Sequence, residues 1–207
     1  GTGVPDLCDI LLMPGSGTAS PNNKEYGSSF SHNNEVAQPG FYAVKLDKHD
    51  IRANLTVTPR VGYHQYIFSQ ANENYILLDL KHRDEVLESS LTLEDSVTLS
   101  GFRRSKSWAQ DQQTFFVIKF SNPILKFGVW QNDQPTQVSI GETISGKNIK
   151  AYFYFETGDT KTIESKVALS PVSVTGAKKN LETELPGWDF MATKSLATTI
   201  WNKELAR

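Results

Sequence analysis

Two neighbouring segments alternate apolar and polar side chains with a period of two residues, and this alternation constrains the fold more than any other feature. The first segment is Tyr42–Leu46 and the second is Ile51–Val57, with polar residues such as Lys45 and Arg52 between the apolar ones. A two-residue period is typical of a strand with one buried face and does not fit a helix. Because only the short polar segment 47–50 connects them, we expect the two strands to pair as an antiparallel hairpin.

More strand patterns follow, and turn residues separate nearly all of them. Pro59 marks a break before the run 61–68, and the almost unbroken apolar segment 75–80 predicts a strand that is covered on both faces. Further candidates are 91–93, 97–99, 114–120, 125–129, 149–155 and 163–174. About ten strands without helices between them predict a mainly β protein, namely a large antiparallel β-sandwich (supersandwich).

The end of the chain changes character. Apolar residues have helical spacing from 177 to 185, the pair Pro186-Gly187 interrupts it, and residues 188–201 suit a second amphipathic helix. We therefore divide the chain into a β-sandwich domain, residues 1–175, and a short C-terminal helical segment, residues 176–207. The apolar face of this segment must be buried, either against the sandwich itself or against a further domain.

The composition argues against several classes of function. In 207 residues, 21 Lys and Arg stand against 23 Asp and Glu, so the formal charge of -2 gives no pull toward nucleic acid. No apolar stretch approaches the roughly 18 to 20 residues of a membrane helix, so we expect no membrane span. Cys8 is the only cysteine, which excludes an internal disulfide and any multi-cysteine metal site. We interpret it as a buried, inert thiol.

A polar stretch in front of the first hairpin concentrates side chains that could meet a ligand. Residues 14–29, rich in Gly, Ser, Pro and Asn, predict a long surface loop that leads into it. His32 and Glu35 follow, but the asparagines between them and Pro39-Gly40 disfavour a helix that would place both on one face. A zinc site would need more ligands at recognisable spacing, so we expect no metal site. Two interpretations remain: polar residues near a glycan or partner surface, or residues whose hydrogen bonds stabilise a turn.

Two other groups of side chains could carry chemistry. The densest ionisable cluster comprises Asp79 and residues 82–85, and glycoside hydrolysis requires paired carboxylates. Asp84 and Glu85 point to opposite faces of an extended chain, however, so we favour a solvated strand end. Trp108 follows a basic, serine-rich loop, and it is either a core or edge residue or an exposed ring that could stack on a sugar. No self-contained catalytic set is visible.

Six groups of residues, spread in order over essentially the whole chain, form a further pattern. They are Gly1-Thr2-Gly3 with Asp6, Asp9 and Ile10-Leu11-Leu12-Met13-Pro14; Phe30-Ser31-His32 with Glu35, Ala37 and Pro39-Gly40-Phe41-Tyr42; Leu55-Thr56 with Thr58, Arg60, Gly62, His64 and Tyr66; Leu78-Asp79-Leu80 with His82; Trp108-Ala109 with Asp111-Gln112; and Asn180-Leu181 with Glu184, Trp188-Asp189-Phe190 and Trp201-Asn202. As a set they resemble glycoside hydrolase family 92, the calcium-dependent exo-α-mannosidases, and in particular their N-terminal β-sandwich domain. The chain departs from the family at Leu7-Cys8, where Tyr-Gly is common, and it starts without the His-containing segment that usually precedes the Gly-Thr-Gly turn.

The resemblance implies a parent enzyme, an α-1,2-type exo-mannosidase, that removes terminal mannose by an inverting route. In this family the catalytic acid, the base and most calcium contacts belong to a helical-barrel domain that follows the sandwich. We therefore expect no catalytic residue and no cofactor in this chain, and calcium in the full-length enzyme. The expected partners are that barrel of the same polypeptide, reached through the helical linker 176–207, and a mannose-containing glycan. The family also implies a periplasmic or extracellular location in a bacterium.

In the family, loops of the sandwich help close the pocket over the barrel. The candidate sugar or pocket-rim residues are Gly1, Thr2, Gly3, Ser31, His32, Glu35 and Trp108. Two alternatives to this function stay open. One is a stand-alone carbohydrate-binding module that uses Trp108 or the segment 30–35, and the other is a purely structural interaction domain.

Overall fold

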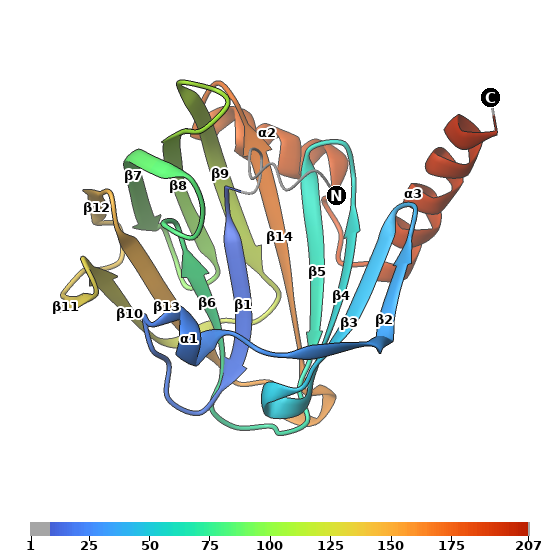
Figure 1. Ribbon diagram of the computed structural model, residues 1–207, viewed down its shortest axis with the longest axis horizontal. Coiled ribbons are helices and arrows are strands. Elements are labelled where there is room, and N and C mark those ends of the chain that lie inside the picture. Colours follow the sequence, from blue (N-terminus) through green and yellow to red (C-terminus); the bar gives the residue numbers. More distant parts are fainter. Residues whose placement is uncertain (1–8, 207) are drawn as a thin grey trace.

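The computed structural model describes residues 9–206 of the chain, and these residues form two antiparallel sheets, one of five strands (sheet A) and one of nine (sheet B). In spatial order, sheet A consists of β1 (Leu11–Ser16), β6 (Asn74–Asp79), β13 (Ile149–Phe155), β10 (Ile124–Gln131) and β11 (Gln134–Thr136). Sheet B consists of β12 (Thr143–Gly146), β7 (Glu85–Leu93), β8 (Thr98–Lys106), β9 (Gln112–Phe120), β14 (Thr162–Ser170), β5 (Val61–Ile67), β4 (Ile51–Val57), β3 (Phe41–Leu46) and β2 (Phe30–Gln38). The predicted antiparallel sandwich is therefore confirmed (Figure 1).

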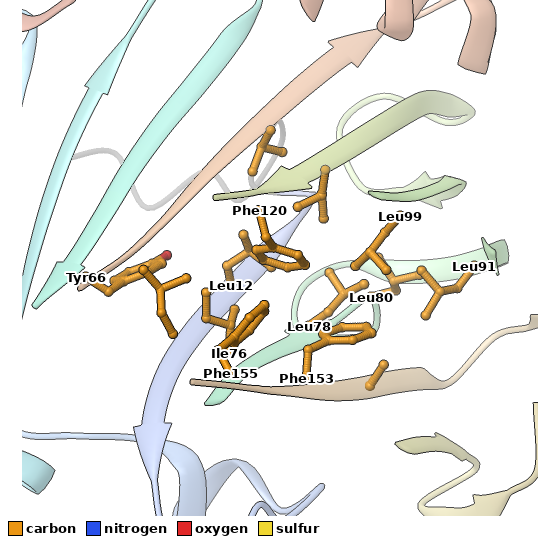
Figure 2. Close-up of a cluster of buried hydrophobic side chains, with 14 of the residues drawn as sticks. Leu12, Tyr66, Ile76, Leu78, Leu80, Leu91, Leu99, Phe120, Phe153 and Phe155 are labelled. Carbon is orange, nitrogen blue, oxygen red and sulfur yellow. The ribbon is translucent and has the colours of Figure 1, made fainter. Parts of the chain in front are cut away.

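The main core lies between the two sheets. It includes Ile76 and Leu78 of β6, Leu99 of β8 and Phe120 of β9, all at most 1% exposed, and Figure 2 shows these side chains converging from both sheets. Strand β6 is buried along its whole length, because Tyr75 and Leu77 point to the other side of sheet A and join a second cluster there. This confirms the strand predicted at 75–80 to be covered on both faces.

The predicted hairpin is also present. Strands β3 and β4 pair in antiparallel register from Phe41 opposite Thr56 to Leu46 opposite Ile51. The connecting segment contains a 3-10 turn, Lys48–Asp50, in which His49 and Asp50 have positive φ angles of 65° and 52°.

Helices cover the outer face of sheet B, as Figure 1 shows. Helix α2 (Val174–Glu184) packs on β14 and β9, and helix α3 (Phe190–Leu205) packs on β4 and β3. Each begins at a side-chain cap: the Ser173 hydroxyl accepts from the Gly176 N–H, and the Asp189 carboxylate accepts from the Ala192 N–H. The short helix α1 (Asn23–Tyr26) lies instead on sheet A. No helix of the described residues is long and apolar enough to cross a membrane.

Several predicted loops are in fact ordered elements. Strand β1 and helix α1 occupy parts of the stretch 14–29 that was expected to be a loop, strand β2 occupies the polar stretch after it, and β8 continues through the basic, serine-rich segment to Lys106. The last strand ends at Ser170, before the predicted 174, because Ser173 starts α2. The interpretation of Asp84 as a solvated strand-end residue is wrong: its side chain is only 2% exposed and faces the buried Arg103, whereas Glu85 is exposed.

Candidate functional site

Three of the predicted site residues lie on β2, at the edge of sheet B, and two of them are in contact. The Nδ1 atom of His32 lies 2.5 Å from Oε2 of Glu35, and Oε1 of Glu35 accepts a 2.6 Å hydrogen bond from the Tyr42 hydroxyl. In a regular strand, residues three apart point to opposite faces. The pairing of β2 with β3 is irregular between Phe30 and Glu35, and this irregularity accompanies the meeting of the two side chains.

The hydrogen bonds set the charge state of the cluster. Those from Tyr42 and His32 hold the pKa of Glu35 below its ordinary value, so Glu35 is a carboxylate at neutral pH. Burial and the Glu35 carboxylate raise the pKa of Tyr42 to about 12, so its phenol stays protonated and donates. The His32 side chain is 87% exposed, so its ring can meet a ligand while Nδ1 contacts Glu35.

The neighbouring side chain, Ser31, is exposed, and its hydroxyl accepts a 3.2 Å hydrogen bond from the Asn33 N–H. This contact is a local turn interaction of the kind that serine commonly makes. Gly1, Thr2 and Gly3 lie outside the described residues, as does Cys8.

Trp108 lies far from this cluster. It occupies the turn between β8 and β9, with 78% of its surface exposed, so it is not a core residue. Strand β8 stands six positions from β2 in sheet B, which at about 4.8 Å per strand corresponds to roughly 30 Å. The structure therefore joins His32 and Glu35, and it does not join them with Trp108.

A buried ion pair near the start of the described chain escaped the sequence analysis. The Arg103 side chain is fully buried, and its Nη1 donates to Oδ1 of Asp9 at 2.7 Å. Its Nε donates to the Leu80 carbonyl at 2.7 Å, and Nη2 donates to the Arg83 carbonyl. The other Asp9 oxygen accepts from the Gln112 side chain at 2.7 Å. The pair connects β8, the segment after β6 and the segment that leads into β1.

A polar cavity of about 350 Å³ lies between helix α1 and one end of sheet A. There the Tyr26 hydroxyl donates to Asp79 at 2.7 Å, and Lys150 donates to Asp133 at 2.7 Å. Burial raises the pKa of Tyr26, and the hydrogen bond from Lys150 lowers that of Asp133. Each of the two carboxylates therefore has a donor close by. These hydrogen bonds are cross-links that hold the α1 segment on sheet A.

Helix α3 buries only one side. Phe190, Thr193 and Ala197 face the sandwich. The apolar residues on the rest of its surface are 48–65% exposed: Met191, Leu196, Ile200, Trp201 and Leu205. Grooves of about 610 Å³ and 550 Å³ flank Trp201, the first toward β4 and the second toward the β2–β3 turn. We call these five residues the outer face of α3.

Helix α3 and the hairpin of β2 and β3 are in close contact. Gly40, in the turn of that hairpin, has a φ of +78°, and a Cβ added to it would lie 2.8 Å from the Ala197 carbonyl carbon. Only glycine suits both the angle and the approach. The hairpin that carries His32 and Glu35 therefore shares the α3 edge of the molecule.

Among the described residues, no group of three or more His, Cys, Asp or Glu side chains could hold a metal ion. We therefore assign no step of a reaction to a metal through the described residues.

One family model matches the chain. A family model described as the glycosyl hydrolase family 92 N-terminal domain matches residues 1–170. No curated protein matches the chain significantly.

Several solved structures are similar over nearly the whole chain. The family GH92 α-mannosidase BT3965 from Bacteroides thetaiotaomicron is 28% identical, with a TM-score of 0.90, and the match covers 100% of this chain and 30% of that one. The GH92 family glycosyl hydrolase ccman5 is 27% identical, with a TM-score of 0.87, and covers 96% and 28%. The GH92 inverting mannosidase BT2199 from Bacteroides thetaiotaomicron VPI-5482, at 22% identity, a TM-score of 0.83 and coverage of 95% and 26%, shares the fold. The chain thus spans less than a third of the length of these proteins.

Proposed function

Because the chain belongs to the glycosyl hydrolase family 92 N-terminal domains, we propose that it serves a larger α-mannosidase as a non-catalytic sandwich. In this proposal it packs on a catalytic helical barrel of the same polypeptide and contributes to the rim of the pocket. The solved relatives support this proposal, since BT3965 and BT2199 are mannosidases.

The observation that carries the proposal is the outer face of α3. Five large apolar side chains stand exposed on one helix, and apolar grooves lie on both sides of it. Exposed apolar side chains that line grooves in this way mark an interaction site. We propose that its occupant is the barrel domain, because the similar structures extend well beyond the part that this chain matches.

The β2 edge is the part of the sandwich that we propose for the pocket rim. It adjoins α3 through Gly40, so a barrel that covers the outer face of α3 would also approach the β2–β3 hairpin. Toward the other end of β2, Ser31 and His32 offer exposed polar groups, and Glu35 contacts the His32 ring. For Gly1, Thr2, Gly3 and Trp108, the rim role stays a prediction.

The cluster also supports a non-catalytic role. An inverting glycosidase needs a protonated carboxylic acid and a second carboxylate that activates water. Glu35 is ionised at neutral pH, and its contacts in the described part of the chain are with Tyr42 and His32. We therefore propose that both catalytic carboxylates, and any calcium ion, belong to the barrel. Preference for α-1,2 linkages and a periplasmic or extracellular location complete the proposal.

Association with a barrel supplied in trans tests the docking surface. We expect W201E and I200E to weaken association at least tenfold, because each places a charge within the apolar outer face of α3. V172E is the matched control, since Val172 is 76% exposed but lies between β14 and α2. The proposal fails if V172E weakens association as much as W201E, or if the wild-type chain does not associate with the barrel.

One observation favours a second candidate, a carbohydrate-binding module. Trp108 projects from its turn with 78% of its surface exposed, and an exposed indole can stack on a sugar ring. Calorimetric titration of the chain with mannose and mannobiose tests this role. Saturable binding that W108A abolishes supports the module, and binding that W108A leaves unchanged removes Trp108 from it.

A further inference from the structure

The outer face of sheet A carries a groove lined by aromatic rings. Its volume is about 480 Å³, within the usual range of small-molecule sites. Trp130 of β10 and the two tyrosines of β13, Tyr152 and Tyr154, form its aromatic lining, and Glu73 and Lys126 lie at its polar part. The centroids of the Trp130 and Tyr152 rings are 4.7 Å apart, and those of Tyr152 and Tyr154 are 5.6 Å apart.

The Tyr152 ring lies flat on the sheet because its neighbour across the strands is a glycine. Tyr152 pairs with Gly128, and a Cβ added to Gly128 would lie 2.3 Å from the Tyr152 hydroxyl oxygen and 2.4 Å from Cζ. The ring therefore occupies the space that a side chain at Gly128 would fill. A tyrosine held in this way and partly exposed presents one face of its ring to the groove.

The polar groups of the groove divide into engaged and available ones. The Tyr154 hydroxyl donates to the Gly17 carbonyl at 2.6 Å and accepts from the Ala19 N–H at 3.0 Å, so this tyrosine anchors the loop after β1. In the described part of the chain, no residue forms a hydrogen bond with the Tyr152 hydroxyl or the Trp130 indole N–H. The Tyr152 hydroxyl is therefore available to a ligand, whereas Trp130, which is 8% exposed, contributes mainly ring surface.

The chemistry of the groove fits a sugar. The face of a pyranose ring carries C–H groups that pack on an aromatic ring, while its hydroxyls require donors and acceptors around the edge. Tyr152 supplies the ring, Lys126 supplies donors from an ammonium group that lies 4.5 Å from the centroid of the Tyr154 ring, and the Glu73 carboxylate supplies an acceptor. One lysine beside one glutamate gives no net charge to select an anion or a cation.

We propose that this groove binds a neutral carbohydrate, with a pyranose ring stacked on Tyr152. Helices α2 and α3 cover the other sheet, as Figure 1 shows, so the groove lies on the opposite side of the sandwich from the outer face of α3. The site is therefore separate from the proposed contact with a barrel, and the inference does not rest on that contact.

Calorimetric titration of the 207-residue chain with α-1,2-mannobiose, maltose and cellobiose tests the proposal. We expect at least one of these sugars to bind saturably. Tyr152→Leu, which removes the ring but keeps an apolar side chain, should weaken that binding at least tenfold. Gly128→Ala should do the same without changing Tyr152, because the new methyl group displaces the end of the flat ring. Val172→Ala, at an exposed position between β14 and α2, should leave the affinity unchanged.

Circular dichroism and thermal melting identify any variant that fails to fold. If Gly128→Ala does not fold, the affinity of Tyr152→Leu alone tests the proposal. A Tyr152→Phe variant, which keeps the ring, decides it if Tyr152→Leu does not fold, and it should bind within threefold of the wild type. The proposal is overturned if none of the three sugars binds, if Tyr152→Leu binds as tightly as the wild type, or if Val172→Ala alone abolishes binding.

Discussion

The buried pair of Arg103 and Asp9 gives the sharpest test of how the sandwich is held together. Replacing Asp9 with alanine leaves the guanidinium of Arg103 in a fully buried position without its 2.7 Å partner. Breaking a buried ion pair by removing one member costs about 3–5 kcal/mol. We expect the lower end, about 3 kcal/mol, because the Leu80 and Arg83 carbonyls still accept from Arg103 and the Asp84 carboxylate lies 3.9 Å away.

Urea denaturation followed by far-ultraviolet circular dichroism measures this loss, and thermal melting should show a Tm lower by about 6–12 °C for a chain of this size. The matched control is the neighbouring pair of Arg104 and Asp111, which also forms 2.6 Å hydrogen bonds but is 39% and 46% exposed. D111A should cost at most about 1 kcal/mol, because water screens an exposed pair.

The double variant D9A/R103M separates a coupled pair from two independent residues. Since R103M removes the charge that D9A leaves unpaired, the double variant should lose less than the sum of the single variants, by about 2 kcal/mol. Additive losses, or a D9A variant as stable as D111A, would refute the argument that this pair is coupled in the core.

Three further predictions concern other parts of the structure. G40A should cost about 2 kcal/mol more in urea denaturation than G141A, because both glycines have positive φ angles but only Gly40 lies against helix α3; equal losses would mean that α3 does not press on this turn. Burial lowers the pKa of Lys166 from 10.5 to about 8, so between these pH values the unfolded chain binds the proton more tightly than the folded chain. The free energy of unfolding should therefore rise from pH 8 to pH 10.5, by up to about 3 kcal/mol relative to K166M. Parallel curves of unfolding free energy against pH for the two proteins would contradict this. E35Q should lower the pKa of Tyr42 from about 12 toward, but not below, 10 in an NMR titration, because burial remains when the carboxylate is gone; an unchanged value would show that the hydrogen bond is absent in solution.

The sequence predicts the strands that bury an apolar face. It does not predict strands whose side chains are exposed or whose buried side chains are polar. Strands β3, β4 and β6 were predictable because their apolar side chains reach the core with the period of a strand. Strand β2 has almost no buried residue, since it is an edge strand, so nothing imposes alternation on its sequence. Strand β8 carries Arg103 at a buried position. Because a charged residue stands where the pattern of a strand would have an apolar one, the segment was predicted to be a basic loop.

The candidate site was predictable in residue type but not in arrangement. The sequence singled out His32 and Glu35, yet their contact depends on an irregular stretch of β2, and the role of Tyr42 was hidden because it occurs in an apolar strand pattern. The wide separation of Trp108 from this pair follows from the strand order of sheet B. Strand order depends on contacts between distant parts of the chain, which local patterns do not encode.

The central claim is that this chain is a non-catalytic part of a larger mannosidase. Hydrolysis of an aryl α-mannoside by the purified 207-residue chain, with and without calcium, tests it most directly when a polypeptide that continues past Arg207 with the following domain is assayed beside it. We predict no turnover by the chain alone and calcium-dependent turnover by the longer polypeptide. Sustained hydrolysis by the chain alone, in proportion to its concentration, would contradict the claim.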